Sequence, residues 1–368
     1  MVKMTFRKAN LTGRFAAGLA VAVAAATSWA CAEQADAPGA PSERVYVANQ
    51  SSASVSVIDA ASGEVIHTVD VTSLGFDMNS RPHHTAPDPD GEHWYVSLIG
   101  GGNVLRFNSD FELVAQAPFE TPGLLSFDPA ANLLYVGRSM MAVNPPQRIG
   151  AIDPADMSIE ELDVFFQRPH ALMVDAAANR VFSASLVENS IAVVDGESGA
   201  PELASVDGPP HTLVQFALSP DRAHLVATTQ LTGKLLVFDA ESSDLALVAE
   251  VDVGTQPWHP VFAPDGGHVY FGAKDDDEIV EVETAGWTVT RRLGGEGIVE
   301  PHGAAVTADG RYLFVSNRNL KGTYTPMADV ENNADVGTVV KVDLEAFEVV
   351  KVIEVGAYPA GISIGSAG

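Results

Sequence analysis

The residues of this chain best suited to chemistry are histidines that return at one position of a repeated segment. Six of the ten histidines occupy or adjoin this position, and they are His83, His84, His170, His211, His259 and His302. Four directly follow a proline, one completes a His-His pair, and one follows Pro257-Trp258. Since a repeat brings equivalent positions together, we expect these imidazoles to converge. Imidazole binds several transition metals, copper(II) most tightly, so the sequence predicts a metal centre with copper as first candidate and zinc as second.

The repeat that would position these histidines is marked by short apolar runs ending in an acid or its amide. Examples are Val55-Ser-Val-Ile-Asp59 and Leu235-Leu-Val-Phe-Asp239, and the runs recur about every 44 residues. Each unit carries four strand-like stretches separated by Gly, Pro, Asp and Ser, as hairpin turns require. A repeat of this length built from β-branched runs indicates a propeller. We expect the terminal acids to start turns by bonding the backbone two residues on, not to form a functional ring.

The two ends of the repeated region predict how the ring closes. Order begins near Arg44 with the second strand of a unit, and the chain ends with an unpaired inner strand over 358–364. We therefore expect an all-β, seven-bladed propeller of four-stranded antiparallel blades. Three N-terminal strands and one C-terminal strand would complete one blade and remove exposed sheet edges. The expected domains are a signal peptide over 1–30, an Ala/Pro-rich tether over 31–43 and the propeller over 44–368.

The repeats resemble those of the YVTN-repeat family, seven-bladed propellers found widely among bacterial extracytoplasmic proteins. The resemblance covers about residues 44–365, and it implies the fold while leaving function open, because propellers host many chemistries. It rests on Val45-Tyr-Val-Ala-Asn49, Val55-Ser-Val-Ile-Asp59, Val251-Asp-Val-Gly254 with Pro257, and Pro264-Asp-Gly266.

The histidine layout also resembles the catalytic propeller of nitrous-oxide reductase, in which a His-His pair and further blade histidines hold a copper–sulfide cluster. His83 and His84 would match the pair, and the remaining histidines would match the blade ligands in role only. Six histidines stand here where that cluster uses seven, and the cysteine-bearing electron-entry domain is absent from this sequence. The resemblance therefore implies a smaller copper centre and not nitrous-oxide reduction.

Residues 1–30 have the features of a secretory signal. A basic start precedes a short Ala-rich apolar core, too short for a membrane span, and Ser28-Trp-Ala30 fits a cleavage site. Cys31, the single cysteine, follows directly. It would be the acylated first residue of a lipoprotein, or it would simply adjoin an ordinary cleavage site. We expect an extracytoplasmic protein, in the periplasm or as an outer-membrane lipoprotein, attached to a membrane only through that lipid.

The charge balance and the single cysteine exclude several functions. Removing residues 1–30 discards four of 21 basic residues and no acid, so the mature net charge would be 17 − 48 = −31. Such a surface repels nucleic acid. One cysteine permits no intrachain disulfide, no c-type haem attachment and no thiolate site of the zinc-ribbon or iron–sulfur type. We expect a monomer whose partner is a small molecule or a protein at the channel mouth.

Five further residues are candidate ligand contacts at that mouth: Trp258, Arg81, Arg168, Asn317 and Arg318. The tryptophan could stack on a ligand or simply cover the channel, and the first two arginines could hold an anion or be solvated. The insertions Ser139–Gln147 and Leu320–Gly337 are expected on the same face, where binding residues concentrate in loops. A second recurring set, His93, His224 and His268, is expected to be solvated on the opposite face.

Three functions stay open from the sequence. A catalytic metal would make the protein a copper-dependent oxidoreductase, with the metal as redox centre or Lewis acid. The second is a non-catalytic scaffold that binds a ligand or a protein with this face and uses the histidines structurally. The third is a metal-assisted lyase or lactonase, because related propellers use histidine bases in such reactions.

Overall fold

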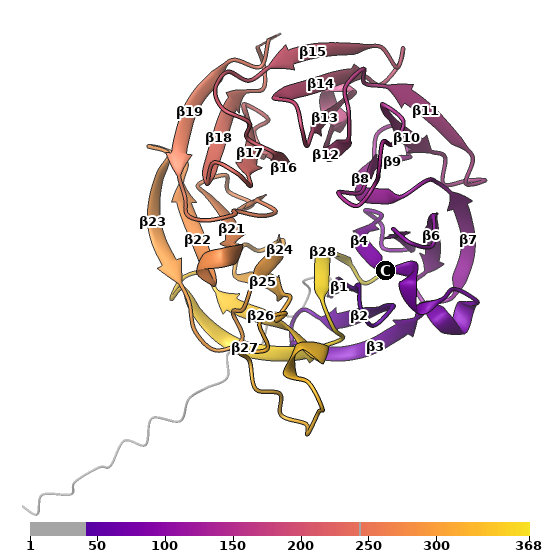
Figure 1. The fold of residues 1–368 in the computed structure, drawn as a ribbon, viewed down its shortest axis with the longest axis vertical. Helices are drawn as coiled ribbons and strands as arrows, with labels where there is room; N and C mark the ends of the chain where they lie inside the picture. Colours follow the sequence, from indigo (N-terminus) through magenta and orange to yellow (C-terminus); the bar gives the residue numbers. More distant parts are fainter. Residues whose placement is uncertain (1–41, 243) are drawn as a thin grey trace, which may run out of the picture. The chain divides into compact units, whose positions relative to one another are not determined.

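The fold is a ring of seven four-stranded antiparallel sheets whose inner strands surround a central axis, the position of the predicted channel (Figure 1). The computed structural model describes residues 42–242 and 244–368. The predicted all-β, seven-bladed propeller is confirmed. The predicted signal peptide, Cys31 and nearly all of the predicted tether lie outside the described residues. None of the helices in the described part is long and apolar enough to cross a bilayer.

We number the sheets as blades in chain order, each running from the channel outwards. Blade 1 contains β28 (Pro359–Ser366), β1 (Glu43–Asn49), β2 (Ser54–Asp59) and β3 (Glu64–Asp70). Blades 2 to 4 contain β4 (Pro82–Pro87), β5 (His93–Leu98), β6 (Asn103–Asn108), β7 (Leu113–Pro118), β8 (Pro122–Asp128), β9 (Leu133–Arg138), β10 (Arg148–Ile152), β11 (Ile159–Asp163), β12 (Pro169–Asp175), β13 (Arg180–Ser185), β14 (Ser190–Asp195) and β15 (Pro201–Ser205). Blades 5 to 7 contain β16 (Leu213–Leu218), β17 (His224–Thr229), β18 (Lys234–Asp239), β19 (Leu247–Asp252), β20 (Val261–Phe262), β21 (His268–Ala273), β22 (Glu278–Glu283), β23 (Thr288–Leu293), β24 (Pro301–Val306), β25 (Tyr312–Asn317), β26 (Gly337–Asp343) and β27 (Glu348–Val355). Within the described residues, five 3₁₀ helices join strands, at Val71–Leu74, Met78–Ser80, Ala176–Ala178, Lys274–Asp276 and Asn333–Asp335.

The ring closes as the sequence predicts, through a blade assembled from both ends of the propeller. β28 pairs antiparallel with β1, with Val45 opposite Ile364 and Val47 opposite Ile362. Val45 and Val47 pack with Phe314 of blade 7 in one buried cluster. The same kind of cluster fills each of the other blade interfaces, so the core is a ring of seven apolar layers.

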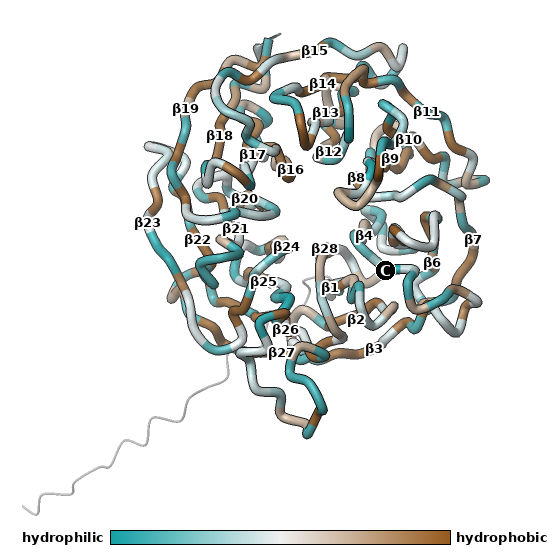
Figure 2. The backbone as a smooth tube through the Cα atoms, viewed as in Figure 1, coloured by the Kyte–Doolittle hydropathy of each residue, from teal (hydrophilic) through white to brown (hydrophobic). Residues whose placement is uncertain are grey.

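The alternation of side chains explains this layering. Middle strands such as β2 are buried along almost their whole length, because both faces of a blade pack on a neighbour. Outer strands such as β23 alternate between exposed and half-buried residues. Figure 2 shows the same mixture of hydrophobic and hydrophilic residues along the outer strands β7 and β19.

The acids at the ends of the third strands form turns, as predicted. Asp153 Oδ1 accepts a hydrogen bond from the backbone of Ala155 at 2.8 Å, and Asp239 Oδ1 accepts one from Glu241 at 2.9 Å. These contacts are local, and the side chains lie away from the channel mouth. The acids therefore shape the hairpins and form no functional ring.

Each inner strand is entered through a residue in the left-handed backbone region, with φ between 46° and 56°; the seven are Arg81, Thr121, Arg168, Thr212, Gln256, Glu300 and Tyr358. The carbonyl of this turn residue accepts a hydrogen bond from the backbone N–H that follows the second strand of its blade. Examples are Ile99 to Arg81 at 3.1 Å and Gln50 to Tyr358 at 2.9 Å. Inner-strand starts and the loops after second strands therefore share one face, which we call the histidine face.

Candidate functional site

A bulge at the start of the inner strands turns adjacent residues towards the channel. In blade 2 the pairing with β5 jumps from Pro82 to Thr85, so His83 and His84 stand in an irregular stretch. A bulge breaks the strict alternation of side chains, which allows both neighbours to join one cluster. Gly361 of the adjacent inner strand makes room, because a Cβ there would lie 2.4 Å from the His83 carbonyl oxygen.

Five of the six predicted histidines form one connected cluster from blades 2, 4, 6 and 7. The ring centroid of His83 lies 6.3 Å from that of His170 and 6.4 Å from that of His302. His259 lies 4.7 Å from His302 and 5.9 Å from His84. His84 is half-buried and the other four are buried. The predicted convergence of these five imidazoles is therefore present in the fold.

Burial makes the cluster neutral at physiological pH. Desolvation lowers the pKa of both His84 and His170 to about 4, and it holds the pKa of His83, His259 and His302 well below the ordinary value. The neighbouring charges act in the same direction, since they come from other imidazoles, arginines and a lysine. A neutral imidazole keeps one nitrogen lone pair, which is the form that binds metals.

Hydrogen bonds fix the tautomers of two rings. His170 Nδ1 lies 2.8 Å from the carbonyl oxygen of Arg138 and must donate to it, so its Nε2 keeps the lone pair. His84 Nδ1 accepts a hydrogen bond from the backbone N–H of Leu125 at 3.3 Å. A neutral His84 therefore carries its proton on Nε2.

Two buried ring nitrogens have no hydrogen-bond partner among the described residues, His83 Nε2 and His302 Nδ1. The other nitrogen of His83, Nδ1, lies 2.8 Å from Nε2 of Gln50. Leaving a buried polar atom unsatisfied costs about 1–3 kcal/mol, which favours a further partner at these atoms. His302 Nδ1 is thus open to a further partner, and His83 Nε2 gains a free lone pair when the Gln50 amide turns its carbonyl oxygen towards Nδ1.

The distances between ring centroids are compatible with imidazoles that share a metal ion, but the side chains are not arranged around one ion. When two imidazole nitrogens bind one ion, each at about 2.0 Å, the distance between the ring centroids depends on the nitrogen–metal–nitrogen angle. It is about 4.5 Å for a right angle and about 6.4 Å for a linear arrangement. The four centroid distances fall in this range. Within residues 42–242 and 244–368, however, no three His, Cys, Asp or Glu side chains are arranged to hold an ion as they stand. A metal would therefore require ring rotations within the cluster.

His211 stands apart from the other five. It precedes the turn residue Thr212, so the position that holds histidine in other blades falls on Val214. Its Nδ1 lies 2.8 Å from the hydroxyl of Thr232, and its Nε2 lies 3.2 Å from the carbonyl oxygen of Asp207. Both nitrogens already have protein partners, and the ring contacts none of the five clustered rings.

Trp258 takes the histidine position in blade 6 and lines the cluster. It is buried, with its ring centroid 5.1 Å from that of His302 and 6.4 Å from that of His259. The Nζ of Lys274 lies 5.5 Å from the Trp258 centroid. Pro260, which has no N–H to donate, follows this segment, and β20 is accordingly short.

The predicted arginines lie on the histidine face in different environments. Arg81 and Arg168 are both turn residues; Arg81 Nη1 lies 3.1 Å from the sulfur of Met141, and Arg168 donates to the carbonyl oxygen of Met140. Arg318 follows β25 and lies over the ring of Tyr358 at 4.0 Å. Burial lowers the pKa of Arg318 to about 10, which leaves it charged.

The sequence predicted Asn317 as a ligand contact but did not point to Gln50. Asn317 is fully buried, and its amide donates to the carbonyl oxygen of Val315 at 2.9 Å while its Oδ1 has no partner among the described residues. Gln50 and Lys274, which contact His83 and Trp258, were not among the predicted residues. The signal was present, because both directly follow the second strand of a blade, as Arg318 does.

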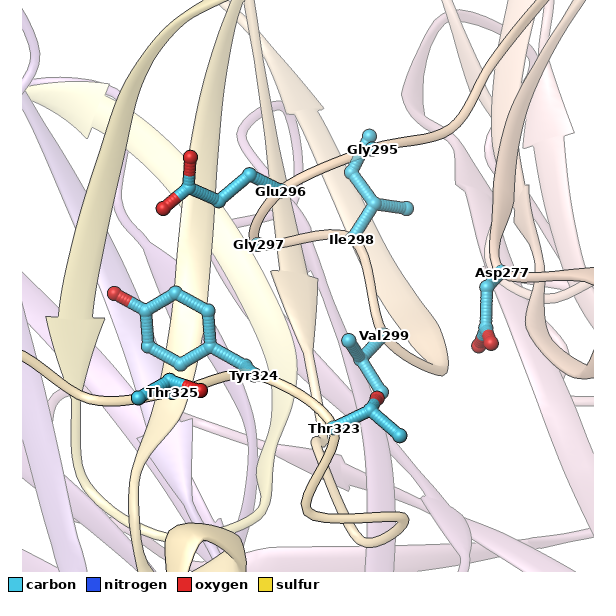
Figure 3. A pocket seen from close by; sticks show the side chains of 9 residues that line it. All are labelled: Asp277, Gly295, Glu296, Gly297, Ile298, Val299, Thr323, Tyr324 and Thr325. Atoms are coloured by element: carbon cyan, nitrogen blue, oxygen red, sulfur yellow. The ribbon is translucent and has the colours of Figure 1, made fainter.

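A pocket on the histidine face lies between blades 6 and 7 and has a volume of about 430 Å³. In Figure 3, Asp277 stands on one side and Glu296 and Tyr324 stand on the other, with Ile298 and Val299 between them. The insertion after β25 forms one wall, and its Lys321 binds Asp277 at 2.8 Å. The insertion therefore shapes a second concave surface beside the histidines.

The second recurring set of histidines is less exposed than the sequence predicts. His93, His224 and His268 lie at the opposite face, as expected, but they are half-buried instead of fully solvated. His93 Nδ1 lies 3.3 Å from Asp88, and the ring of His224 packs 5.3 Å from that of Trp287. Packing against turns and outer strands covers these rings, although they contribute nothing to the cluster.

Comparisons with known proteins show the fold alone. No family model matches the chain, and no curated protein matches it. Similar solved structures include apo AztD from Citrobacter koseri, with 11% identity, a TM-score of 0.62 and coverage of 88% of this chain and 98% of that one. Kuenenia stuttgartiensis hydrazine synthase has 18% identity, a TM-score of 0.58 and coverage of 72% and 77%. The dihydro-heme d1 dehydrogenase NirN in complex with DHE has 16% identity, a TM-score of 0.59 and coverage of 87% and 74%.

Proposed function

We propose that this propeller binds a transition metal through histidines at its channel mouth, copper first and zinc second. The observation that carries the proposal is the cluster of five neutral imidazoles, four of them buried and His84 half-buried. Imidazole suits copper, zinc, iron and nickel, and copper(II) is favoured by the order of affinities. No thiolate takes part in the cluster, which consists of imidazoles alone.

The central ligands of the proposed site are His83 and His302. Each has a buried ring nitrogen that lacks a protein partner in the described part of the chain. His170 adds an Nε2 lone pair fixed by its hydrogen bond to Arg138. His84 and His259 complete the cluster, whereas His211 lies outside it because both its nitrogens are engaged.

A bound copper ion would supply redox or Lewis-acid chemistry. The protein residues would hold it in a largely dehydrated pocket, and the indole of Trp258 would shield one side. A catalytic protein of this kind would be an oxidoreductase. The proposal also includes three predictions from the sequence: export, a lipid on Cys31 and membership of the YVTN-repeat family.

Metal analysis tests the proposal. Mature protein purified without an affinity metal column should retain roughly one equivalent of copper after incubation and desalting. The double variant His83→Ala/His302→Ala should lose it, while His211→Ala should retain it with an unchanged circular dichroism spectrum. Less than about a tenth of an equivalent of either copper or zinc in the wild type would reject the metal site.

Exposed apolar side chains favour a second function, the docking of a partner protein. Val143 is 85% exposed and Met327 82% exposed, and both lie in the insertions of the histidine face. Apolar side chains held on loops above a rigid scaffold are typical of binding surfaces. Deleting residues 320–337 should abolish capture of such a partner and leave metal content unchanged. Loss of both would indicate damage to the fold.

A further inference from the structure

Arg318 is a half-buried cation that has no anionic partner among the described residues. Its guanidinium stacks on Tyr358 at 4.0 Å, and its Nε is buried without a hydrogen-bond acceptor in the described part of the chain. Arg318 forms no ion pair with any residue of 42–242 or 244–368. A buried charge is costly unless it is paired, so this arrangement favours an added anion.

The nearest acids are engaged elsewhere. Glu300 accepts a hydrogen bond from the backbone N–H of Lys321 at 3.1 Å, and Asp275 pairs with Lys274 at 3.2 Å. Both carboxylates act on Arg318 only through their charge. The backbone N–H of Arg318 donates to the carbonyl oxygen of Glu300 at 3.3 Å, two residues before His302 in the chain.

The propeller repeat explains where Arg318 points. Residues that follow the second strands of two other blades reach the next blade: Gln50 reaches His83 of blade 2 at 2.8 Å, and Gln230 reaches Gln256 of blade 6 at 3.3 Å. The same step takes Arg318 from blade 7 to Tyr358 of blade 1. Lys274 differs, because it lies over Trp258 of its own blade.

The histidine position of blade 1 is Ala360, which carries no ring. Blades 3, 5 and 6 also lack a histidine at this position, with Gly123, Val214 and Trp258. The residues that precede them around the ring are uncharged, namely Ile99, Leu186 and Gln230. Only blade 1 therefore combines a missing imidazole with an incoming cation.

We propose that Arg318, beside His83 and His302, binds a small anion with two adjacent oxygens, such as a carboxylate or nitrite. This deepens the proposed function, because the anion would lie beside the same histidine cluster. The planar guanidinium fork matches two oxygens side by side. Burial strengthens the attraction, since the local dielectric constant is lower than that of water. The net negative charge of the chain repels anions at long range, so binding would depend on this local cation.

Calorimetric titration with sodium nitrite and sodium acetate tests the inference. The full-length mature protein is titrated in metal-free and copper-treated forms, with sodium chloride as a control for charge without two oxygens. One of the two oxyanions should bind, and Arg318→Met should weaken that binding at least about tenfold. Arg318→Lys, which keeps the charge and loses the fork, should weaken it to an intermediate extent. Arg311→Met, at the opposite face, should leave it unchanged.

Three results would overturn the inference. The first is a wild type that binds neither oxyanion in either form, and the second is unchanged binding by Arg318→Met with a native circular dichroism spectrum. Chloride binding equal to that of both oxyanions would also overturn the two-oxygen ligand class. Oxyanion binding that depends on Arg318 in a protein that takes up no copper would uphold this inference and refute the metal proposal. The two ideas therefore fail separately.

Discussion

Gln50 Nε2 lies 2.8 Å from Nδ1 of His83, and this contact joins blade 1 to the histidine cluster. Both side chains are buried. The orientation of the amide determines which ring nitrogen carries the proton. With its NH₂ group towards the ring, Gln50 leaves the proton on Nε2; with its carbonyl towards the ring, it accepts from Nδ1–H and frees the Nε2 lone pair. Gln50 is therefore expected to control whether His83 can bind a metal through Nε2.

Replacing Gln50 by leucine should weaken copper binding by about tenfold or more, because outer hydrogen bonds orient ligating imidazoles. Competition titration against a chromogenic chelator measures the change. Gln230→Leu is the matched control, since Gln230 holds the same position in blade 5 and bonds Gln256 instead of a histidine. Equal copper affinity in Gln50→Leu and wild type would contradict the orienting role.

The fold could be predicted from the sequence because the repeat is regular where the core forms. The apolar runs that end in acids mark the third strands, and the strand left over at 358–364 predicted closure through blade 1. Both features concern burial and periodicity, which are local in the sequence. Convergence of the five histidines followed from the same repeat, because equivalent positions of a propeller face one channel.

The site itself could be predicted only in part. His211 was grouped with the others by its preceding proline, but the turn residue Thr212 moves the channel position on to Val214. The bulge that brings His84 beside His83 depends on backbone pairing between strands, which the sequence does not show directly. The contacts of Gln50 and Arg318 cross between blades, so they depend on the rotation from one blade to the next.

Gly361→Ala should damage both stability and the histidine cluster. A Cβ at Gly361 would stand 2.4 Å from the carbonyl oxygen of His83 and 2.7 Å from the Cα of His84, both backbone atoms of the bulge. Relieving such overlap costs about 1–3 kcal/mol. Urea unfolding and copper titration should both show the effect. The control is the exposed Gly286→Ala, where a Cβ meets only Thr288 at 3.9 Å. Equal stability in the two variants would mean that the bulge does not need this glycine.

The interface that closes the ring, between blades 7 and 1, should contribute as much to stability as an interface between consecutive blades. Phe314 packs where blade 7 meets blade 1, and Phe182 packs where blade 4 meets blade 5; both are fully buried. Phe314→Ala and Phe182→Ala should each lower the free energy of unfolding by about 3–5 kcal/mol. The exposed Val350→Ala should change it by less than about 0.5 kcal/mol. A small effect of Phe314→Ala beside a large effect of Phe182→Ala would show that β28 does not close the ring tightly.

Acidification should destabilise the fold through the histidine cluster. The pKa of His84 and that of His170 fall from 6.5 to about 4 on folding. Between these values the unfolded chain binds more protons than the folded one, so stability falls as the pH falls through this window. Above pH 6.5 both states are neutral at these residues and the effect vanishes. One such histidine contributes a loss of about 3 kcal/mol when the whole window is crossed.

Urea unfolding at intervals between pH 7 and pH 5 measures this effect, because the carboxylates whose pKa values are lowered titrate further down. Burial raises the pKa of Glu43 and of Asp88, and these two carboxyl groups would change stability in the opposite direction. Replacing His170 with glutamine should reduce the pH dependence, since one proton-binding difference is removed. His67→Gln, on the exposed strand β3, should leave the slope as it is. Metal-free protein is required, because a bound cation would add its own proton competition at the same nitrogens. A slope that is identical in wild type and His170→Gln would show that the buried imidazole at this position does not titrate as its burial implies.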